Sequence, residues 1–371
     1  MKKALIFYIS KQSGHFHAAN AIEKGLSSLS PRMRVEKINA LTYTNPVLGK
    51  IINKAYLEII KKRPEIWEHI YDNPDVMSRT KKARDALHRF NMSKIKRLLE
   101  KRSPDVIICT QAFPCGMVAD YKRTTGYSVP LMGVLTDHAP HSYWLFKEVD
   151  YYVAPSDETA AALEKKGIPR EKIKTCGIPV DPKFKKGHDV PRLRKELGLT
   201  KGDPVILIMG GSQGLGAVEE AVRSIMEDQR HSYQILVVTG SNNKLYKRLG
   251  RLRKALSNSA LHVVSFVDNI DELMEASDMI VTKAGGMTTA EAMVKDLPLV
   301  IIDPIPGHER MNTDFLVGKG AAVEVSEYRQ LPLKINEIFD SRGTLEKMKD
   351  NIRKLAKPDS AVEIAELALG V

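Results

Sequence analysis

Short apolar stretches alternate with helix-like segments along the whole chain. They are Ala4–Ile9, Asp105–Cys109, Val129–Leu135, Tyr151–Ala154, Val205–Met209, Gln234–Val238, Leu261–Val264, Met279–Val281 and Leu297–Ile302. A strand covered by helices on both faces reads as a continuous apolar stretch, and strands separated by helices run parallel. The pattern therefore predicts an α/β protein with two doubly wound, Rossmann-like lobes that face a cleft.

The chain is expected to divide near residue 180. A length of 371 residues exceeds what one hydrophobic core usually organises. The stretch 176–182 contains two prolines, which fit neither a helix interior nor a central strand, and is typical of a linker. We predict one domain over residues 1–180 and a second over residues 181–371, with a last helix that can pack back on the first domain.

The positive charge is concentrated in the first domain. The net charge is +12, and residues 1–180 hold 30 Lys and Arg against 18 Asp and Glu, whereas the remaining residues hold 27 of each. A one-sided basic field attracts nucleic acid or an anionic membrane surface, although it can also serve solubility alone. No nucleic-acid-binding motif or aromatic-basic interleaving is present, so we expect an anionic membrane surface and no nucleic acid as partner.

One segment has the composition of an interfacial helix. Between Asn45 and Arg63 an apolar face is flanked by lysines, and Trp67 and Tyr71 follow. The same pattern also describes a helix packed on a lobe. The sequence has no apolar stretch long enough to span a bilayer or act as a signal peptide, and its three cysteines lack the spacing of a zinc site or disulfide framework. We expect a cytoplasmic protein, peripherally associated with the inner face of the cell membrane.

The loop after the first strand carries a candidate general base. Ser10–His15 lies between that strand and an alanine-rich helix. Such a loop occupies the carboxyl edge of the sheet, where open α/β sheets bind ligands. Histidine titrates near neutral pH, so His15 beside Gly14 can accept a proton there, although loop histidines are also common surface or capping residues.

A turn in the second domain is typical of phosphate binding. After the strand ending at Val281, two glycines and two threonines open a helix. The glycines let the backbone approach a phosphate, while free amides and the positive end of the helix dipole receive its charge. Glu291 lies one turn further and can accept hydrogen bonds from a ribose. The alternative is an ordinary tight turn between a strand and a helix.

Three more loops are expected at the same edge of the second sheet. Two of them, 266–268 and 306–312, follow strands and should converge with the phosphate turn. The third contains Gly211 and Ser212, and we interpret it as the cleft floor facing donor phosphates. It does not fit the G-x-G-x-x-G fingerprint in either register, which argues against a dinucleotide oxidoreductase.

At these residues the sequence resembles the lipid-forming glycosyltransferases that include monogalactosyldiacylglycerol synthases and bacterial processive diacylglycerol glucosyltransferases, MurG-like enzymes of glycosyltransferase family 28. The resemblance covers nearly the whole chain. It rests on Gly14-His15 with Ala18-Ala19, Thr136-Asp137 with His141 and Trp144, the turn 285–291, and residues 307–312. It implies a glycosyltransferase B fold, a UDP-sugar donor bound mainly by the second lobe, a lipid acceptor entering by the first, and no required metal.

The resemblance also implies roles for individual residues. Phe266 and Val267 lie against the uracil, Glu291 holds the ribose, and the diphosphate is cradled by Gly285, Gly286, Met287 and Thr288. Glu309 and Asn312 face the sugar, together with His308, where the family often has Gln. Gly14 belongs to the donor side as well. His15 resembles the catalytic histidine, and Asp137, His141 and Trp144 lie on the acceptor side.

These parts predict a single inverting displacement in which an acceptor hydroxyl attacks the anomeric carbon as UDP leaves. His15 acts as the base, directly or with Glu309 or Asp137 as an orienting carboxylate. No Asp-x-Asp pair is present to clamp a metal, so we expect no cofactor. The UDP-sugar is a co-substrate, and helix amides stabilise the negative charge that develops on UDP as it leaves. The alternatives are a UDP-sugar isomerase or epimerase on the same fold and a transferase with a polyprenyl-linked acceptor; the basic first lobe favours a transferase.

Overall fold

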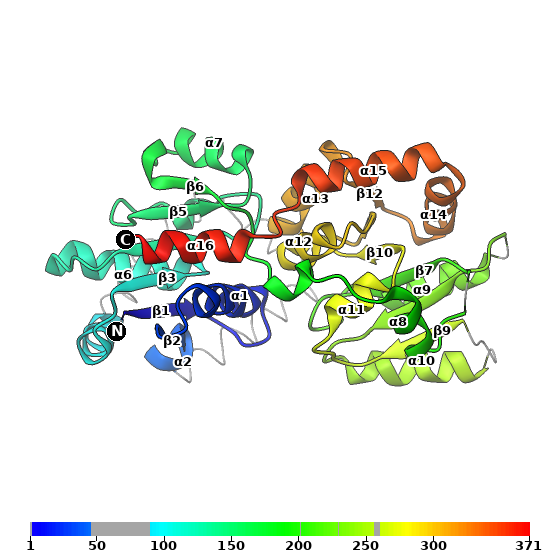
Figure 1. Cartoon of the computed structure of the whole chain (residues 1–371), viewed down its shortest axis with the longest axis horizontal. Coiled ribbons are helices and arrows are strands. Elements are labelled where there is room, and N and C mark those ends of the chain that lie inside the picture. Colours follow the sequence, from blue (N-terminus) through cyan, green and yellow to red (C-terminus); the bar gives the residue numbers. More distant parts are fainter. Residues whose placement is uncertain (1, 46–89, 201, 229, 256–259) are drawn as a thin grey trace. The chain divides into compact units, whose positions relative to one another are not determined.

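The computed structural model describes residues 2–45, 90–200, 202–228, 230–255 and 260–371, which form two compact units (Figure 1). The first unit comprises Met1–Pro182, Pro306–His308 and Asp359–Val371, and the second comprises Lys183–Ile305 and Glu309–Pro358. Each unit contains one six-stranded sheet whose neighbouring strands are all parallel. The predicted fold class of two doubly wound α/β lobes is confirmed.

The first sheet has the strand order β2-β1-β3-β4-β5-β6. Its strands are β1 (Lys3–Tyr8), β2 (Arg34–Asn39), β3 (Val106–Cys109), β4 (Leu131–Val134), β5 (Tyr151–Ala154) and β6 (Ile173–Thr175). The helices of this unit are α1 (Gly14–Leu29), α2 (Ala40–Thr44), residues 90–102, α6 (Ala112–Thr125), α7 (Asp157–Lys165) and α16 (Ser360–Leu369), with the short turns η1 (Ser142–Trp144) and η2 (Arg170–Lys172).

Alternate side chains of the first sheet enter two separate cores. Leu5 and Phe7 of β1 pack in one core with helix 90–102, α6 and α7. Ala4, Ile6 and Tyr8 point to the opposite face and pack with α1 and α16. Both faces of β1 are therefore apolar, as expected for a central strand of a parallel sheet.

The second sheet has the strand order β12-β11-β10-β7-β8-β9. Its strands are β7 (Val205–Met209), β8 (Gln234–Val238), β9 (Leu261–Val264), β10 (Met279–Thr282), β11 (Leu299–Ile302) and β12 (Ala322–Val325). The accompanying helices are η3 (Pro182–Lys185), α8 (Val190–Glu196), α9 (Val218–Glu227), α10 (Asn243–Ala255), α11 (Ile270–Glu275), α12 (Gly286–Val294), α13 (His308–Gly318), η4 (Tyr328–Gln330), α14 (Leu331–Asp340) and α15 (Arg342–Leu355).

Three strands were not predicted from the sequence: β2, β6 and β12. All three are edge strands. Each has only one neighbour and is partly exposed, so polar residues interrupt its apolar pattern; β2, for example, reads RVEKIN. The nine predicted stretches all correspond to observed strands. Eight of them are interior strands, and the ninth, the edge strand β9, has the largely apolar sequence Leu-His-Val-Val.

Each sheet has one topological switch point. The chain leaves β1 toward β2 on one side and leaves β3 toward β4 on the other, so the switch lies between β1 and β3. In the second sheet it lies between β7 and β10, which lead to β8 and β11. Loops that leave neighbouring strands in opposite directions open a crevice where α/β proteins bind ligands. The two switch points therefore mark where a site is expected in each unit.

The last helix packs on the first helix of the first unit. Figure 1 shows α16, in red, beside α1, in blue, and both helices contribute to the same core. The contact is close because Gly25 has no side chain: a Cβ atom there would lie 2.3 Å from the carbonyl oxygen of Ala361. Ser360 Oγ also accepts a hydrogen bond of 2.9 Å from the amide of Val180.

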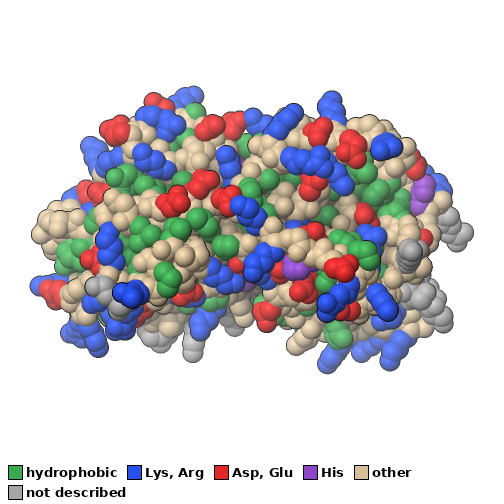
Figure 2. Space-filling view, in the orientation of Figure 1, with side chains coloured by type: hydrophobic (Ala, Val, Ile, Leu, Met, Phe, Trp, Pro, Cys, Tyr) green, Lys and Arg blue, Asp and Glu red, His purple; other side chains and the backbone are tan. Residues whose placement is uncertain are grey.

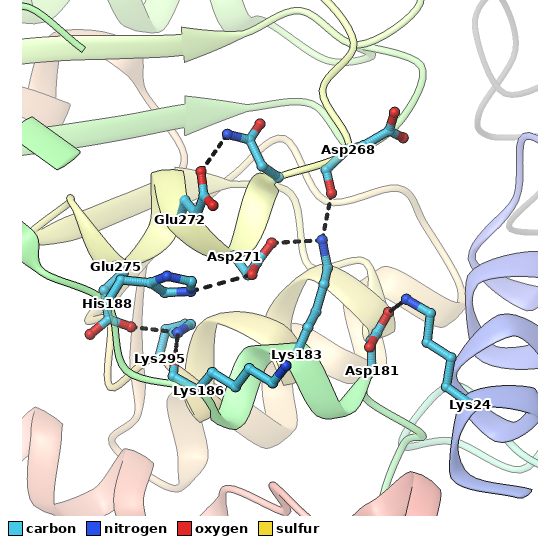
Figure 3. Close-up of polar contacts among 11 residues, drawn as sticks. Lys24, Asp181, Lys183, Lys186, His188, Asp268, Asp271, Glu272, Glu275 and Lys295 are labelled. Atoms are coloured by element: carbon cyan, nitrogen blue, oxygen red, sulfur yellow. Dashed lines mark hydrogen bonds and ion pairs between the residues drawn. The ribbon is translucent and has the colours of Figure 1, made fainter. Parts of the chain in front are cut away.

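The linker is fixed on either side of Pro182 (Figure 3). In the first unit Asp181 pairs with Lys24 of α1. In the second unit Lys183 Nζ lies 2.6 Å from Asp271 Oδ1, and His188 Nε2 lies 3.5 Å from the other oxygen of the same carboxylate. The residues on either side of Pro182 are therefore held by ion pairs, one within each unit.

The predicted interfacial helix between Asn45 and Arg63, with Trp67 and Tyr71, lies outside the described residues apart from Asn45. Among the helices that the structure describes, none combines the length and the apolar character needed to cross a membrane. Cys109, Cys115 and Cys176 are buried and unbonded to one another.

The close packing of α1 on α16 predicts that Gly25→Ala destabilises the protein. The added methyl group overlaps the Ala361 backbone, and overpacking of this kind costs about 1–3 kcal/mol. Gly250→Ala in α10 is the matched control, because no atom lies within 4 Å of the Cβ position there and alanine favours a helix by roughly 0.5–1 kcal/mol. Urea unfolding of both variants measures the difference; equal stabilities would contradict the close contact.

Candidate active site

In the first unit, a buried threonine holds the backbone around His15 at the switch point. His15 lies in the first turn of α1, and Thr110 follows β3. Thr110 Oγ1 lies 2.9 Å from the carbonyl oxygen of His15 and 3.3 Å from that of Phe7, at the end of β1. One side chain therefore ties both strands of the switch to the histidine.

The His15 ring contacts a polar pair that follows β4. Its Nδ1 lies 3.2 Å from Thr136 Oγ1, which in turn lies 3.3 Å from Asp137 Oδ2. Burial lowers the pKa of His15, an effect that the Asp137 carboxylate opposes and His308 reinforces. A lowered pKa keeps the ring neutral at pH 7, which is the form that can accept a proton. Asp137 is connected to His15 through Thr136, and which carboxylate orients the base stays a prediction.

The other residues predicted on the acceptor side are more enclosed than the sequence indicated. Trp144 is 4% exposed and belongs to the core, where its ring lies 6.2 Å from that of His141. Its ring therefore packs in the core, and its place on the acceptor side stays a prediction. His138, not singled out from the sequence, is half-buried, and burial lowers its pKa to about 4, so it is neutral at pH 7.

In the second unit, the predicted phosphate turn leads from β10 into α12. Gly285 is the N-cap residue and Gly286 the first helical residue. Gly285 has φ of −68°, and the nearest atom to a Cβ there is Glu309 Oε1 at 3.8 Å. Neither backbone strain nor crowding thus requires glycine at this position. An open position without a side chain fits close approach by a ligand to the amides of the first turn.

The side chains of this turn differ in their burial and in their contacts. Thr289 Oγ1 lies 3.2 Å from the carbonyl oxygen of Gly285 and 3.0 Å from that of Gly286, so its hydroxyl is used within the helix. The hydroxyl of Thr288, which is half-buried, has no such contact within the described residues of the helix. Met287 is buried, and Glu291 is half-buried on the next turn.

Glu309 and Asn312 of α13 hold the phosphate turn in place. Glu309 is 3% exposed; its Oε1 lies 2.6 Å from Lys283 Nζ, and its Oε2 accepts a 2.9 Å hydrogen bond from the amide of Ile305. Asn312 is fully buried, and its Nδ2 donates to the carbonyl oxygen of Ala284 at 2.9 Å. Both side chains were predicted to face the sugar, and the structure shows that they also brace the backbone that leads into α12.

The loop after β7 lies against the same lysine. Three of its glycines have positive φ: Gly211 at 68°, Gly214 at 55° and Gly216 at 87°. A Cβ on Gly216 would lie 3.5 Å from Lys283 Cδ and 3.4 Å from Asp303 Oδ2. The carbonyl oxygen of Ser212 accepts a 3.0 Å hydrogen bond from the amide of Ser241. The loop after β7 and the turn after β10 thus meet through Gly216 and Lys283 at the second switch point, and the donor-side role of Gly211 and Ser212 stays a prediction.

The remaining predicted donor residues lie on three other segments of the chain. Phe266 follows β9 and is 52% exposed, and Val267 is half-buried. An exposed aromatic ring at the end of a strand is suited to stacking on a base. His308 is the first residue of α13 and is half-buried, and Gly14 is the first residue of α1. Their ligand roles stay predictions.

Three polar residues of the site were missed or not given a role from the sequence: Thr110, Thr136 and Lys283. Each follows directly after a buried strand or within two residues of its end. A polar residue at the carboxyl end of an apolar strand is itself a signal for a site in an α/β fold. Within the described residues, no group of three His, Cys, Asp or Glu side chains is arranged to hold a metal ion.

The two halves of the chain match two known families. Residues 15–180 match the family described as monogalactosyldiacylglycerol (MGDG) synthase, and residues 205–364 match the glycosyltransferase family 28 C-terminal domain. A processive diacylglycerol beta-glucosyltransferase of Bacillus subtilis (strain 168) is 29% identical over 366 residues, which are 98% of this chain and 94% of that protein.

Solved structures share the architecture at much lower identity. Acinetobacter baumannii MurG is 15% identical with a TM-score of 0.65, and Neisseria meningitidis UDP-GlcNAc 2-epimerase is 14% identical with a TM-score of 0.61; each match covers 100% of both chains. Two doubly wound lobes with a site at each switch point define the glycosyltransferase B fold, which transferases and epimerases have in common. Within it, residues 15–180 of this chain match the MGDG synthase family and residues 205–364 match the family 28 C-terminal domain, so the chain is a glycosyltransferase.

The open position at Gly285 predicts that Gly285→Ala loses ligand binding while the protein still folds. The methyl group has space in the protein but occupies the region where we expect a phosphate to approach the helix amides. We expect urea unfolding to change by less than about 0.5 kcal/mol, as for other sites away from the core. Isothermal calorimetry with UDP should show at least tenfold weaker binding, with Gly250→Ala as control. Unchanged UDP affinity would remove this turn from the donor site.

Proposed function

We propose that this glycosyltransferase transfers a hexose from a UDP-sugar to diacylglycerol with inversion of configuration, at the surface of a membrane. The observation that carries the proposal is the similarity over 98% of the chain to a protein named as a processive diacylglycerol beta-glucosyltransferase. The MGDG synthase match over residues 15–180 points to the same acceptor class. Fold similarity alone does not distinguish a transferase from an epimerase.

The donor side follows from the second switch point. The amides of the first turn of α12 and the positive end of its dipole receive the diphosphate, whose negative charge increases as UDP leaves. Phe266 stacks on the uracil, and Glu291 accepts hydrogen bonds from the ribose. Glu309 and Asn312 keep the turn rigid, so the amides do not need to reorganise when charge develops.

The acceptor side follows from His15. In the neutral form favoured by its lowered pKa, the ring takes the proton of the acceptor hydroxyl as the oxygen attacks the anomeric carbon. The bond from that carbon to UDP breaks in the same step, and UDP keeps the electron pair. Proton transfer by a positioned base typically accounts for about 10²- to 10⁴-fold of the rate.

We also propose that the reaction requires no metal ion. The sequence has no Asp-x-Asp pair to bridge a metal to the diphosphate. The helix N-terminus supplies fixed positive potential at the place where such a metal acts in other transferases. Addition of EDTA to the transfer assay is therefore expected to leave the products and their rate unchanged.

The transfer reaction is tested by mass spectrometry of lipid products. The protein is incubated with diacylglycerol vesicles and UDP-glucose, UDP-galactose or UDP-N-acetylglucosamine in turn, and we expect a hexosyl-diacylglycerol with at least one of the hexose donors. His15→Ala should lose at least 100-fold in kcat while UDP affinity by calorimetry stays within twofold, because the base acts on the acceptor. Transfer to polyprenyl phosphate alone, or conversion of the UDP-sugar without a lipid product, would replace this proposal by one of the two alternatives.

Membrane recruitment rests on the basic first domain. On the face in Figure 2, acidic side chains are interspersed with basic ones, so this face is poorly suited to a purely electrostatic contact. The lysine-rich segment 50–62 is the better candidate from its sequence. Each basic residue near an anionic surface contributes about 1 kcal/mol within a Debye length of about 8 Å, so a few suffice for reversible binding.

We expect the protein to sediment with phosphatidylglycerol vesicles more than with phosphatidylcholine vesicles, and high salt to release it. Replacing Lys50, Lys54, Lys61 and Lys62 with Gln should reduce sedimentation without changing UDP affinity. The matched control removes four exposed cations of α10 in the second unit, Lys244, Lys247, Arg251 and Lys254. Equal loss in both variants, or equal binding to both kinds of vesicle, would refute recruitment by the first domain.

A further inference from the structure

We propose that Thr136 is a positioning residue that connects Asp137 to His15 and holds the imidazole in the tautomer with its proton on Nδ1. The inference deepens the proposed function, because it states which ring nitrogen accepts the proton of the acceptor hydroxyl. In this arrangement Nδ1–H donates to Thr136, and Nε2 keeps the lone pair that serves as the base.

The direction of the two hydrogen bonds follows from the number of protons available. An ionised carboxylate only accepts, so Thr136 Oγ1 donates its single proton to Asp137 Oδ2 at 3.3 Å. The same oxygen can then interact with His15 Nδ1, 3.2 Å away, only as an acceptor. This assignment of the hydroxyl proton places the ring proton on Nδ1. Both distances are long, as is common for catalytic hydrogen bonds before substrate binds.

Both ends of this connection are held by buried structure. Thr136 is 6% exposed and follows β4, where the amide of Leu135 donates to the carbonyl oxygen of Val153 at 3.1 Å. On the other side, Thr110 holds the backbone of His15. The hydroxyl therefore follows β4, whereas the ring belongs to the first turn of α1, which Thr110 ties to the end of the neighbouring strand β3.

The charges that face His15 agree with this arrangement. Burial and His308 lower the pKa of the ring, whereas Asp137 and a hydrogen bond to the Thr110 backbone raise it. When Nε2 takes the proton, the imidazolium keeps its Nδ1–H bond to Thr136, and Asp137 stabilises the new positive charge through the hydroxyl. The proton taken by Nε2 is the one lost by the attacking hydroxyl, and UDP leaves with the electron pair of the broken bond.

The tautomer can be measured without any substrate. A long-range ¹H–¹⁵N correlation spectrum of protein labelled in the histidine rings distinguishes Nδ1–H from Nε2–H, and His15→Gln identifies the His15 signals by their loss. We expect wild type and Thr136→Ser to have Nδ1–H. Thr136→Val, which has the same shape without the hydroxyl, should shift the ring toward Nε2–H. An unchanged tautomer in Thr136→Val would overturn the proposal.

The kinetics of sugar transfer provide a second test of the role of Thr136. Thr136→Val should lower kcat by about 10- to 100-fold with little change in KM for the UDP-sugar, whereas Thr136→Ser stays within threefold of wild type. Asp137→Asn should lower kcat and also move the acidic limb of the pH profile to lower pH. The direction follows because Asp137 raises the pKa of His15, and loss of the charge keeps the base neutral in more acidic solution.

The two measurements separate the possible failures. If Thr136 serves only packing, Thr136→Val changes the unfolding midpoint but leaves the tautomer as in wild type. If the protein is not a transferase, the NMR result stands while no lipid product forms. If Asp137→Asn leaves the acidic limb in place, the charge does not reach His15, and the connection through Thr136 is rejected.

Discussion

Each unit depends on a pair of neighbouring parallel strands that must stay together while the chain leaves them in opposite directions. From β1 the chain enters α1, which packs with α16 in one core, and from β3 it enters α6, which packs in the other. A buried threonine bridges the ends of each pair: Thr110 Oγ1 lies 3.3 Å from the carbonyl oxygen of Phe7, and Thr282 Oγ1 lies 2.8 Å from that of Met209. Each hydroxyl adds a side-chain hydrogen bond to a strand-end carbonyl oxygen where the loops separate; the carbonyl oxygen of Phe7 also accepts one of 3.1 Å from the Thr110 amide.

The phosphate turn illustrates how a buried charge can serve a binding site. An ionised carboxylate in the interior is costly unless it is paired and fully hydrogen-bonded. Glu309 meets both conditions, with Lys283 on one oxygen and the Ile305 amide on the other. The pair therefore joins three segments, the end of β10, the loop after β11 and the start of α13. Removing Lys283 or Glu309 leaves the other charge unpaired in an apolar environment, so the two residues act as one unit.

The interior strands could be predicted from the sequence, because a buried strand is an uninterrupted apolar stretch, and the candidate site residues were predicted where such a stretch ends. His15 and the turn at Gly285 were found in this way. The edge strands β2, β6 and β12 were not, since one-sided pairing leaves their polar residues in solvent. The bracing role of Asn312 and the enclosure of Trp144 depend on contacts between segments distant along the chain, which no local pattern encodes.

The packing of α16 on α1 has a consequence for how the protein is made. The two helices bury apolar residues against each other in one core of the first unit, yet the entire second unit lies between them in the chain. During synthesis the ribosome releases α1 early and residues 360–369 only after every strand of the second sheet has emerged. The apolar face of α1 around Gly25 therefore stays uncovered while the second unit folds, and the unit translated first is the one completed last.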